Sequence, residues 1–75
     1  MNAARRKKIK EIISKLNDLN TELEEIRDEE QESLDNIPEN LQETERYEKS
    51  EEALSVLDNA VSVLDDVVSN FEDLM

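Results

Sequence analysis

The chain has 75 residues with neither cysteine nor histidine, which excludes disulfide staples and the usual zinc ligand sets. A single core of this size is marginal, so oligomerisation is the remaining source of further burial. The formal net charge is −12, which disfavours direct binding to nucleic acid or to anionic membranes and favours a basic protein surface. No apolar run approaches the roughly 18 residues of a membrane span, and we expect a mature, unprocessed cytoplasmic protein.

The charge is distributed unevenly along the chain. Five basic residues, and no acidic ones, lie in the first ten positions: Arg5, Arg6, Lys7, Lys8 and Lys10. The rest of the chain carries all 21 acidic residues against four basic ones. We expect the basic start to pair with the acidic end of a second helix, near Asp65, Asp66, Glu72 and Asp73. Contact with phosphates or with an anionic membrane is the alternative.

The first long segment predicts an amphipathic helix over about residues 3–35. Its apolar residues alternate in spacings of three and four, which place them along one seam: Ile9, Ile12, Leu16, Leu19, Leu23 and Ile26. Ile13 widens this seam. The apolar pattern breaks at Glu30 and Ser33. The charge-rich composition alone would be compatible with disorder, but the apolar periodicity outweighs it and favours a helix.

The only proline of the glycine-free chain lies in the next segment, which predicts a turn over about 36–43. Pro38 disfavours helical geometry at Ile37, and Asp35 or Asn36 can close the first helix. Thr44 is a suitable N-cap for a second helix, with Glu45 in its first turn. A second helix that begins at Pro38 is the alternative.

The last segment predicts a helix over about 44–74 with a broad apolar stripe. A seam of alternating spacing contains Tyr47, Ser50, Leu54, Leu57, Val61, Leu64, Val68, Phe71 and Met75. Further rows flank it on both sides: Ala53, Ala60, Val67 and Leu74, and also Val56 and Val63. This stripe is wider than the ~100° that a single partner covers, so the helix requires two neighbours.

Folding the chain back near residue 40 predicts an all-α, antiparallel two-helix hairpin, coiled-coil-like, in one domain spanning 1–75. Leu16 then lies level with Leu64, and Leu23 lies level with Leu57. Because one hairpin leaves the broad stripe uncovered, we expect a homodimeric four-helix bundle with the second helices central. The predicted dimer interface is Leu54, Val56, Ala60, Val61, Val63, Val67, Val68, Phe71 and Leu74.

The residue types do not favour catalysis or a cofactor. A nucleophile needs a neighbouring base, and with no histidine or cysteine the serines lie in helix-surface patterns. The acidic run around Glu30 could gather a hard cation, but it lacks the ligand spacing and glycine turn of a calcium loop. We expect no enzyme, no cofactor and no metal site, with Glu30 solvated or hydrogen-bonded by Tyr47.

The central block IRDEEQESLDNIPENLQETERYEKSEEAL, residues 26–54, resembles a block in small acidic helical-hairpin proteins of bacteriophages and prophages. In those proteins a similar segment joins two helices; the matching parts here are residues 27–32, 37–42 and 44–46. The resemblance implies a phage accessory protein, in a bacterial host cell, of a kind that often binds or inhibits host or defence proteins. It carries no specific activity over to these residues.

Six polar residues flank the turn beyond what a bare turn requires: Arg27, Glu29, Gln31, Gln42, Glu45 and Arg46. One interpretation is an intramolecular polar lock in which Arg27 or Arg46 pairs with carboxylates of the tip. The other is a partner-binding surface.

Residues 22–52 carry fourteen acidic against three basic residues, an array that can imitate the phosphates of DNA and inhibit a nucleic-acid-binding protein. The alternative function is a structural component of a larger helical complex.

Overall fold

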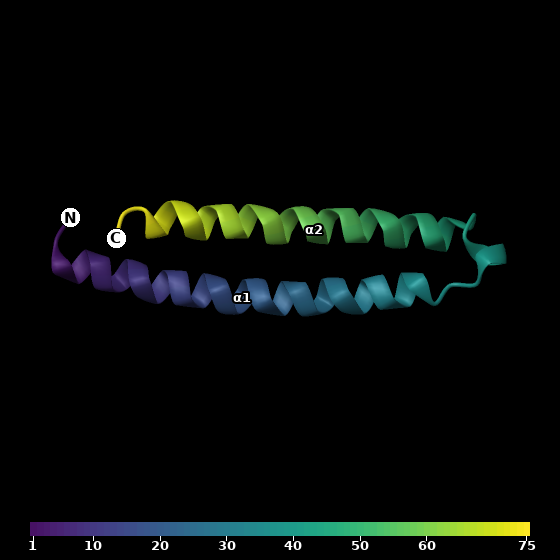
Figure 1. The fold of residues 1–75 in the computed structure, drawn as a ribbon, viewed down its shortest axis with the longest axis horizontal. Helices are drawn as coiled ribbons and strands as arrows, with labels where there is room; N and C mark the ends of the chain where they lie inside the picture. Colours follow the sequence, from purple (N-terminus) through teal and green to yellow (C-terminus); the bar gives the residue numbers. More distant parts are fainter.

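The computed structural model describes all of residues 1–75 as an antiparallel hairpin of two long helices (Figure 1). Helix α1 spans Ala3–Asp35, a 3-10 turn η1 spans Glu39–Leu41, and helix α2 spans Glu45–Glu72. The two helices contact each other along their length, and the molecule measures 59 × 15 × 13 Å. Both chain termini lie at one end and the turn lies at the other (Figure 1). Neither helix combines the length and apolarity of a membrane span.

Side-chain caps define where the two long helices begin. The Asn2 side chain accepts a hydrogen bond from the backbone N–H of Arg5 at 2.9 Å. Thr44, at the position that the sequence indicates, accepts from the N–H of Tyr47 at 3.4 Å. Its hydroxyl also donates to the Leu41 carbonyl at 2.7 Å, so one side chain ties the turn to the start of α2. Such caps satisfy donors that the first helical turn leaves free.

The turn between the helices is short and contains no left-handed residue. Asn36 is the C-cap of α1, and its N–H donates to the Glu32 carbonyl. Pro38 then adopts an extended conformation with φ −57° and ψ 146°, which stops the helix because proline disfavours helical geometry in the residue before it. The following 3-10 turn reverses the chain into Thr44.

The seam of α1 that faces α2 differs in part from the predicted one. The side of α1 turned toward α2 carries residues alternately four and three apart: Ile9, Ile13, Leu16, Asn20, Leu23, Arg27, Glu30 and Leu34. Ile13 and Leu34 are buried, whereas Ile12, Leu19 and Ile26, predicted to lie in the seam, are about half exposed at 49%, 54% and 51%. Relative to the prediction, α1 is therefore rotated about its axis, so that the row of Ile12, Leu19 and Ile26 lies beside the contact with α2 and not within it.

Two polar side chains of α1 account for this rotation. Asn20, only 4% exposed, donates from Nδ2 to the Asp65 carboxylate at 2.8 Å and to the Val61 carbonyl at 3.4 Å. Arg27 Nε lies 3.6 Å from Asp58 Oδ1. These contacts exist only when Asn20 and Arg27 turn toward α2. They also correct the register, because Asn20 lies level with Val61–Asp65, whereas the predicted pairing placed it level with Ala60.

On α2 the predicted seam is the one that packs against α1. Leu54, Val61 and Val68 are its buried residues, each 6% exposed. They follow one another at intervals of seven, so one row of the helix lies at the bottom of the contact. The flanking row of Val56 and Val63 stays exposed, at 68% and 49%. As the sequence predicts, α1 alone covers only part of the apolar stripe of α2.

Candidate protein-binding surfaces

The turn end of the hairpin carries a hollow of about 580 Å³. It is lined by residues from the end of α1, the turn and the start of α2: Ser33, Asn36, Ile37, Pro38, Leu41, Thr44 and Arg46. Leu41 is 45% exposed there. The hollow therefore offers an apolar floor next to the guanidinium of Arg46, a combination suited to a peptide segment or a side chain of another protein.

The six predicted partner-binding residues lie around this end but do not form one cluster. Glu29 is exposed, and Gln31 Nε2 donates to Asp35 Oδ1 at 2.9 Å along α1. Gln42 is the C-cap residue of the 3-10 turn. Glu45 Oε1 forms an ion pair at 3.1 Å with Nζ of Lys49, one helical turn along α2. Each of these four residues is thus solvated or engaged within its own segment.

The two arginines proposed as a polar lock behave differently from each other. Arg27 pairs with the adjacent Asp28 at 3.2 Å and with Asp58 across the hairpin at 3.6 Å. It therefore joins the two helices below the tip and does not pair with tip carboxylates. Arg46 makes no ion pair within 4.0 Å and lines a second, shallow hollow with Glu30, Glu45, Lys49 and Ser50. A lock made of tip carboxylates is not formed.

Glu30 is the carboxylate that faces the contact between the helices. It is half-buried and so remains partly solvated, which is one of the two predicted alternatives; no hydrogen bond joins it to Tyr47, which was the other. It lines the shallow hollow together with Arg46 and Lys49 but makes no ion pair with either within 4.0 Å. No group of three or more acidic residues has the arrangement of a metal site.

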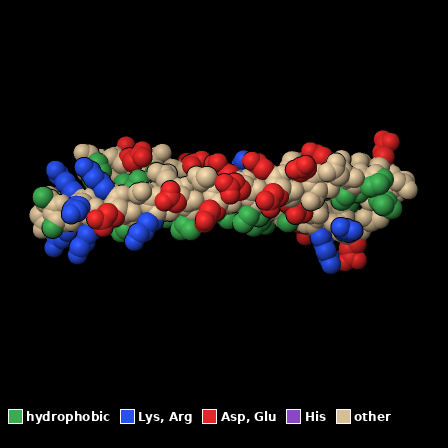
Figure 2. All heavy atoms as spheres, turned by 90° about the horizontal axis from the view of Figure 1, so that it is seen from below, with side chains coloured by type: hydrophobic (Ala, Val, Ile, Leu, Met, Phe, Trp, Pro, Cys, Tyr) green, Lys and Arg blue, Asp and Glu red, His purple; other side chains and the backbone are tan.

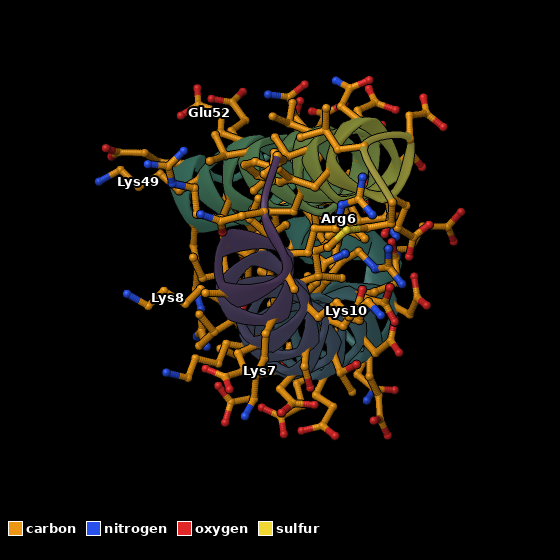
Figure 3. All side chains as sticks on the ribbon, turned by 90° about the vertical axis from the view of Figure 1, so that its left-hand side faces the viewer. Arg6, Lys7, Lys8, Lys10, Lys49 and Glu52 are labelled. Atoms are coloured by element: carbon orange, nitrogen blue, oxygen red, sulfur yellow. The ribbon has the colours of Figure 1, made fainter.

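The basic start of α1 does not pair with the acidic end of α2, contrary to the prediction. The ion pairs of the hairpin involve only Arg27 and Lys49 as cations. Viewed from the terminal end, Arg6, Lys7, Lys8 and Lys10 project in different directions around α1 (Figure 3). Exposed ion pairs gain little against the entropy of their long side chains, so these charges stay free to meet another molecule.

The predicted dimer-interface residues fall into two groups. Leu54, Val61 and Val68 are buried against α1, and Phe71 is half-buried in the same seam. The remaining five lie beside the seam, on α2, together with exposed Ala53 and with the exposed row of α1. We call this set the apolar face: Ile12, Leu19, Ile26, Ala53, Val56, Ala60, Val63, Val67 and Leu74.

The rows of the two helices belong to one side of the hairpin. The row of Val56 and Val63 therefore lies next to the row of Ala60 and Val67, and the prediction that these rows flank the α2 seam on both sides is wrong. Ser33 lies seven residues after Ile26, and Arg46 lies seven residues before Ala53, so each continues one row of the apolar face. Ser33 and Arg46 line the same hollow at the turn. The contacts of Asn20 with Asp65 and of Arg27 with Asp58 mark the opposite, polar side. Seen from the α1 side, hydrophobic side chains gather along one edge and at the turn end, carboxylates spread over the middle of the rod, and lysine and arginine side chains gather at the end that holds the termini (Figure 2).

Sequence reasoning missed the buried amide of Asn20. Its Oδ1 has no hydrogen-bond partner, although its Nδ2 is fully used. The available signal was its spacing, because Asn20 lies seven residues from both Ile13 and Arg27 and four residues after Leu16. A polar residue at such a position in a coiled coil fixes register at a cost in stability.

Taken together, the hairpin presents an apolar floor at the turn, an apolar face along one side and carboxylates elsewhere. Comparison with protein-family models, with curated proteins and with solved structures finds no match.

Proposed function

We propose that this protein acts by protein–protein binding and not by catalysis, as an acidic helical rod that occupies a basic site on another protein. The observation that carries the proposal is that its carboxylates are nearly all exposed and mostly make no ion pair. Nineteen of the 21 acidic residues are exposed, and only Asp28, Glu45 and Asp58 take part in ion pairs. The negative field is therefore directed outward and is scarcely neutralised within the molecule.

The rigidity of the scaffold makes this field specific in space. The carboxylates are attached to two long helices whose contact is anchored by buried Leu54, Val61 and Val68. A fixed array of charges binds a basic cleft with less loss of conformational freedom than a disordered acidic tail would. It competes there with nucleic-acid phosphates, so the proposed partner is a host or defence nucleic-acid-binding protein, in a phage or prophage context.

The turn end is the proposed place of contact. It combines exposed carboxylates such as Glu29 with exposed Leu41 and with Arg46, which has no ion-pair partner in the hairpin. An apolar centre with a charged rim is the usual anatomy of a protein interface. The charges would govern the rate of association and its salt dependence, and Leu41 would contribute to the lifetime of the complex.

A second function, as a structural component of a larger helical assembly, is favoured by a different observation. The apolar face leaves Ile12, Leu19 and Ile26 about half exposed along one side of α1. Exposed apolar patches of this kind mark interaction sites. The smallest assembly that covers the face is the homodimeric four-helix bundle, which we propose as the state in which the protein binds its partner.

The binding proposal is tested by capture from a bacterial lysate on the immobilised chain at low and at high salt. We expect a basic nucleic-acid-binding protein that is retained at low salt, released at high salt and displaced by added duplex DNA. Retention that is insensitive to salt, with growth of assemblies beyond a dimer, would support the structural component instead.

Two matched variants locate the contact. The first neutralises three exposed carboxylates around the turn: Glu32→Gln, Glu39→Gln and Glu43→Gln. The second neutralises three exposed carboxylates away from the turn: Glu11→Gln, Glu25→Gln and Glu72→Gln. Both variants change the net charge equally. Loss of the captured protein in the first but not in the second supports the turn end as the site, and equal loss contradicts it.

A further inference from the structure

One row of α1 at the border of the apolar face has an ordered charge pattern. It contains Lys8, Lys15, Glu22 and Glu29, spaced seven residues apart. All four are exposed and none makes an ion pair within the hairpin. Lys8 projects to the same side as Lys49 of α2 and away from the side of Lys10 (Figure 3). Since Lys49 lies seven residues before Val56, this row forms the α1 rim of the apolar face.

The charge order of α1 does not follow the helix dipole. Acidic residues are stabilising in the first turn of a helix and basic residues in the last. Helix α1 has no acidic residue in its first turn and no basic residue in its last, and its basic residues gather at the N-terminal end instead. The pattern is therefore unfavourable within the helix. An intermolecular partner with the opposite order would give it a favourable role.

A copy of the same helix, running antiparallel, has that opposite order. If two α1 helices cross antiparallel with residue 19 facing residue 19, Lys8 of one copy meets Glu29 of the other, and Lys15 meets Glu22. The apolar row has its centre within about half a residue, or ~0.75 Å, of the centre of the charged row, because Ile12 then meets Ile26, and Leu19 meets itself. Two independent rows of one helix are thus compatible with one two-fold axis close to Leu19.

The alternative parallel arrangement, with both turns at one end, lacks this complementarity. There α1 of one copy crosses α2 of the other, and the charged rim of α1 meets the row of Lys49, Val56, Val63 and Asn70. Glu22 and Glu29 would then be placed against valines, which leaves their carboxylates without partners at a desolvated rim. Electrostatics therefore favours the arrangement with the turns at opposite ends.

We propose that a second copy of this chain covers the apolar face, tip to tail, about a two-fold axis at Leu19. This deepens the self-association of the proposed function and rests on it. With extents of 59 Å by 13–15 Å, the face has an area on the order of 800 Å², which is what each partner contributes to a standard interface. The α2 helices then also face each other, and Val63 and Val67 lie near their centre. The two turns stay free at opposite ends.

The first test exchanges charges along the rim. One variant carries Lys8→Glu and Lys15→Glu, so its rim is entirely acidic; the other carries Glu22→Lys and Glu29→Lys. Each alone has a dimer dissociation constant raised by about tenfold or more in analytical ultracentrifugation, and an equimolar mixture restores wild-type affinity. The matched control Lys7→Glu with Lys10→Glu has the net charge of the first variant but leaves the rim intact, and it dimerises like the wild type.

The second test uses the absence of native cysteine, which makes any introduced thiol unique. Leu19→Cys oxidises to a covalent dimer, and Ile12→Cys mixed with Ile26→Cys forms the mixed dimer in preference to either homodimer. The arrangement with both turns at one end would instead link Leu19→Cys to Val67→Cys. That result overturns the proposed orientation, as does failure of the mixed rim variants to restore the dimer.

The outcomes also separate this proposal from the binding function on which it rests. A wild-type chain that sediments as a monomer overturns the second copy as occupant and leaves the apolar face to a foreign protein. Salt-sensitive capture of a basic protein by that monomer would still support the binding function. A dimer with Leu19 at its axis that captures nothing would support the geometry alone.

Discussion

Replacing Asn20 by leucine is predicted to make the hairpin more stable. Asn20 is 4% exposed and lies in the seam between Leu16 and Leu23. Its Oδ1 is buried without a partner, which costs about 1–3 kcal/mol, and a buried leucine side chain contributes about 1.5–3 kcal/mol. Against this, the substitution removes the hydrogen bond to the Asp65 carboxylate, worth about 1.5–3 kcal/mol.

The balance of these contributions favours leucine by about 2 kcal/mol. Asp65 is exposed and regains water once Asn20 is gone, so the loss on that side is smaller than the two gains together. In a chain of this length 1 kcal/mol corresponds to about 4–8 °C in Tm. We therefore expect Asn20→Leu to raise Tm by roughly 10 °C.

The assay is urea and thermal unfolding followed by circular dichroism, at one fixed protein concentration for all variants. The urea midpoint should rise with an unchanged slope, since the surface exposed on unfolding is nearly the same. Asn20→Asp is the control, because it keeps the size but replaces the donor with a carboxylate facing Asp65, and it should destabilise at neutral pH. If Asn20→Leu lowers the midpoint as well, the bonds of Asn20 outweigh apolar burial and the reasoning is refuted.

Two further changes test the ends and the middle of the hairpin. Thr44→Ala removes the acceptor for the Tyr47 N–H and the donor to the Leu41 carbonyl. Thermal unfolding should show that the free energy of unfolding falls by about 1 kcal/mol, whereas Thr44→Ser should keep most of the wild-type stability. Arg27→Ala breaks the ion pair with Asp58. Because both side chains are partly solvated, the free energy of unfolding measured with urea should fall by no more than ~1 kcal/mol, and by less at high salt. A loss of several kcal/mol would show that Arg27 is a structural lock after all.

The fold could be predicted from local signals, but the rotation of α1 could not. Pro38 and the Thr44 cap affect only residues close to them in sequence, so the turn and the start of α2 could be predicted from the sequence. The choice between Ile12 and Ile13 as the inward residue depends on Asn20 reaching Asp65, a contact between residues 45 positions apart. Apolar periodicity alone favours the row with Leu19 and places it inside.

The candidate surfaces were predictable in kind and less so in detail. The broad apolar stripe of α2 indicated an uncovered face, and Val56 and Val63 are exposed as that pattern implies. The contribution of α1 to the same face follows from the rotation, so it was not visible beforehand. The pairing expected for the basic start assumed that opposite charges at one end meet, but exposed side chains gain too little to be held in one geometry.

The single short turn has a consequence for how the protein folds. Contacts next to the turn, such as those around Leu34 and Leu54, close small loops, whereas contacts near the termini join residues that are far apart along the chain. The hairpin should therefore zip from the turn outward and open from the termini inward. Amide exchange would record this as protection that declines from the turn-proximal parts of both helices toward Ala3 and Glu72, so the basic end of α1 is the part released first.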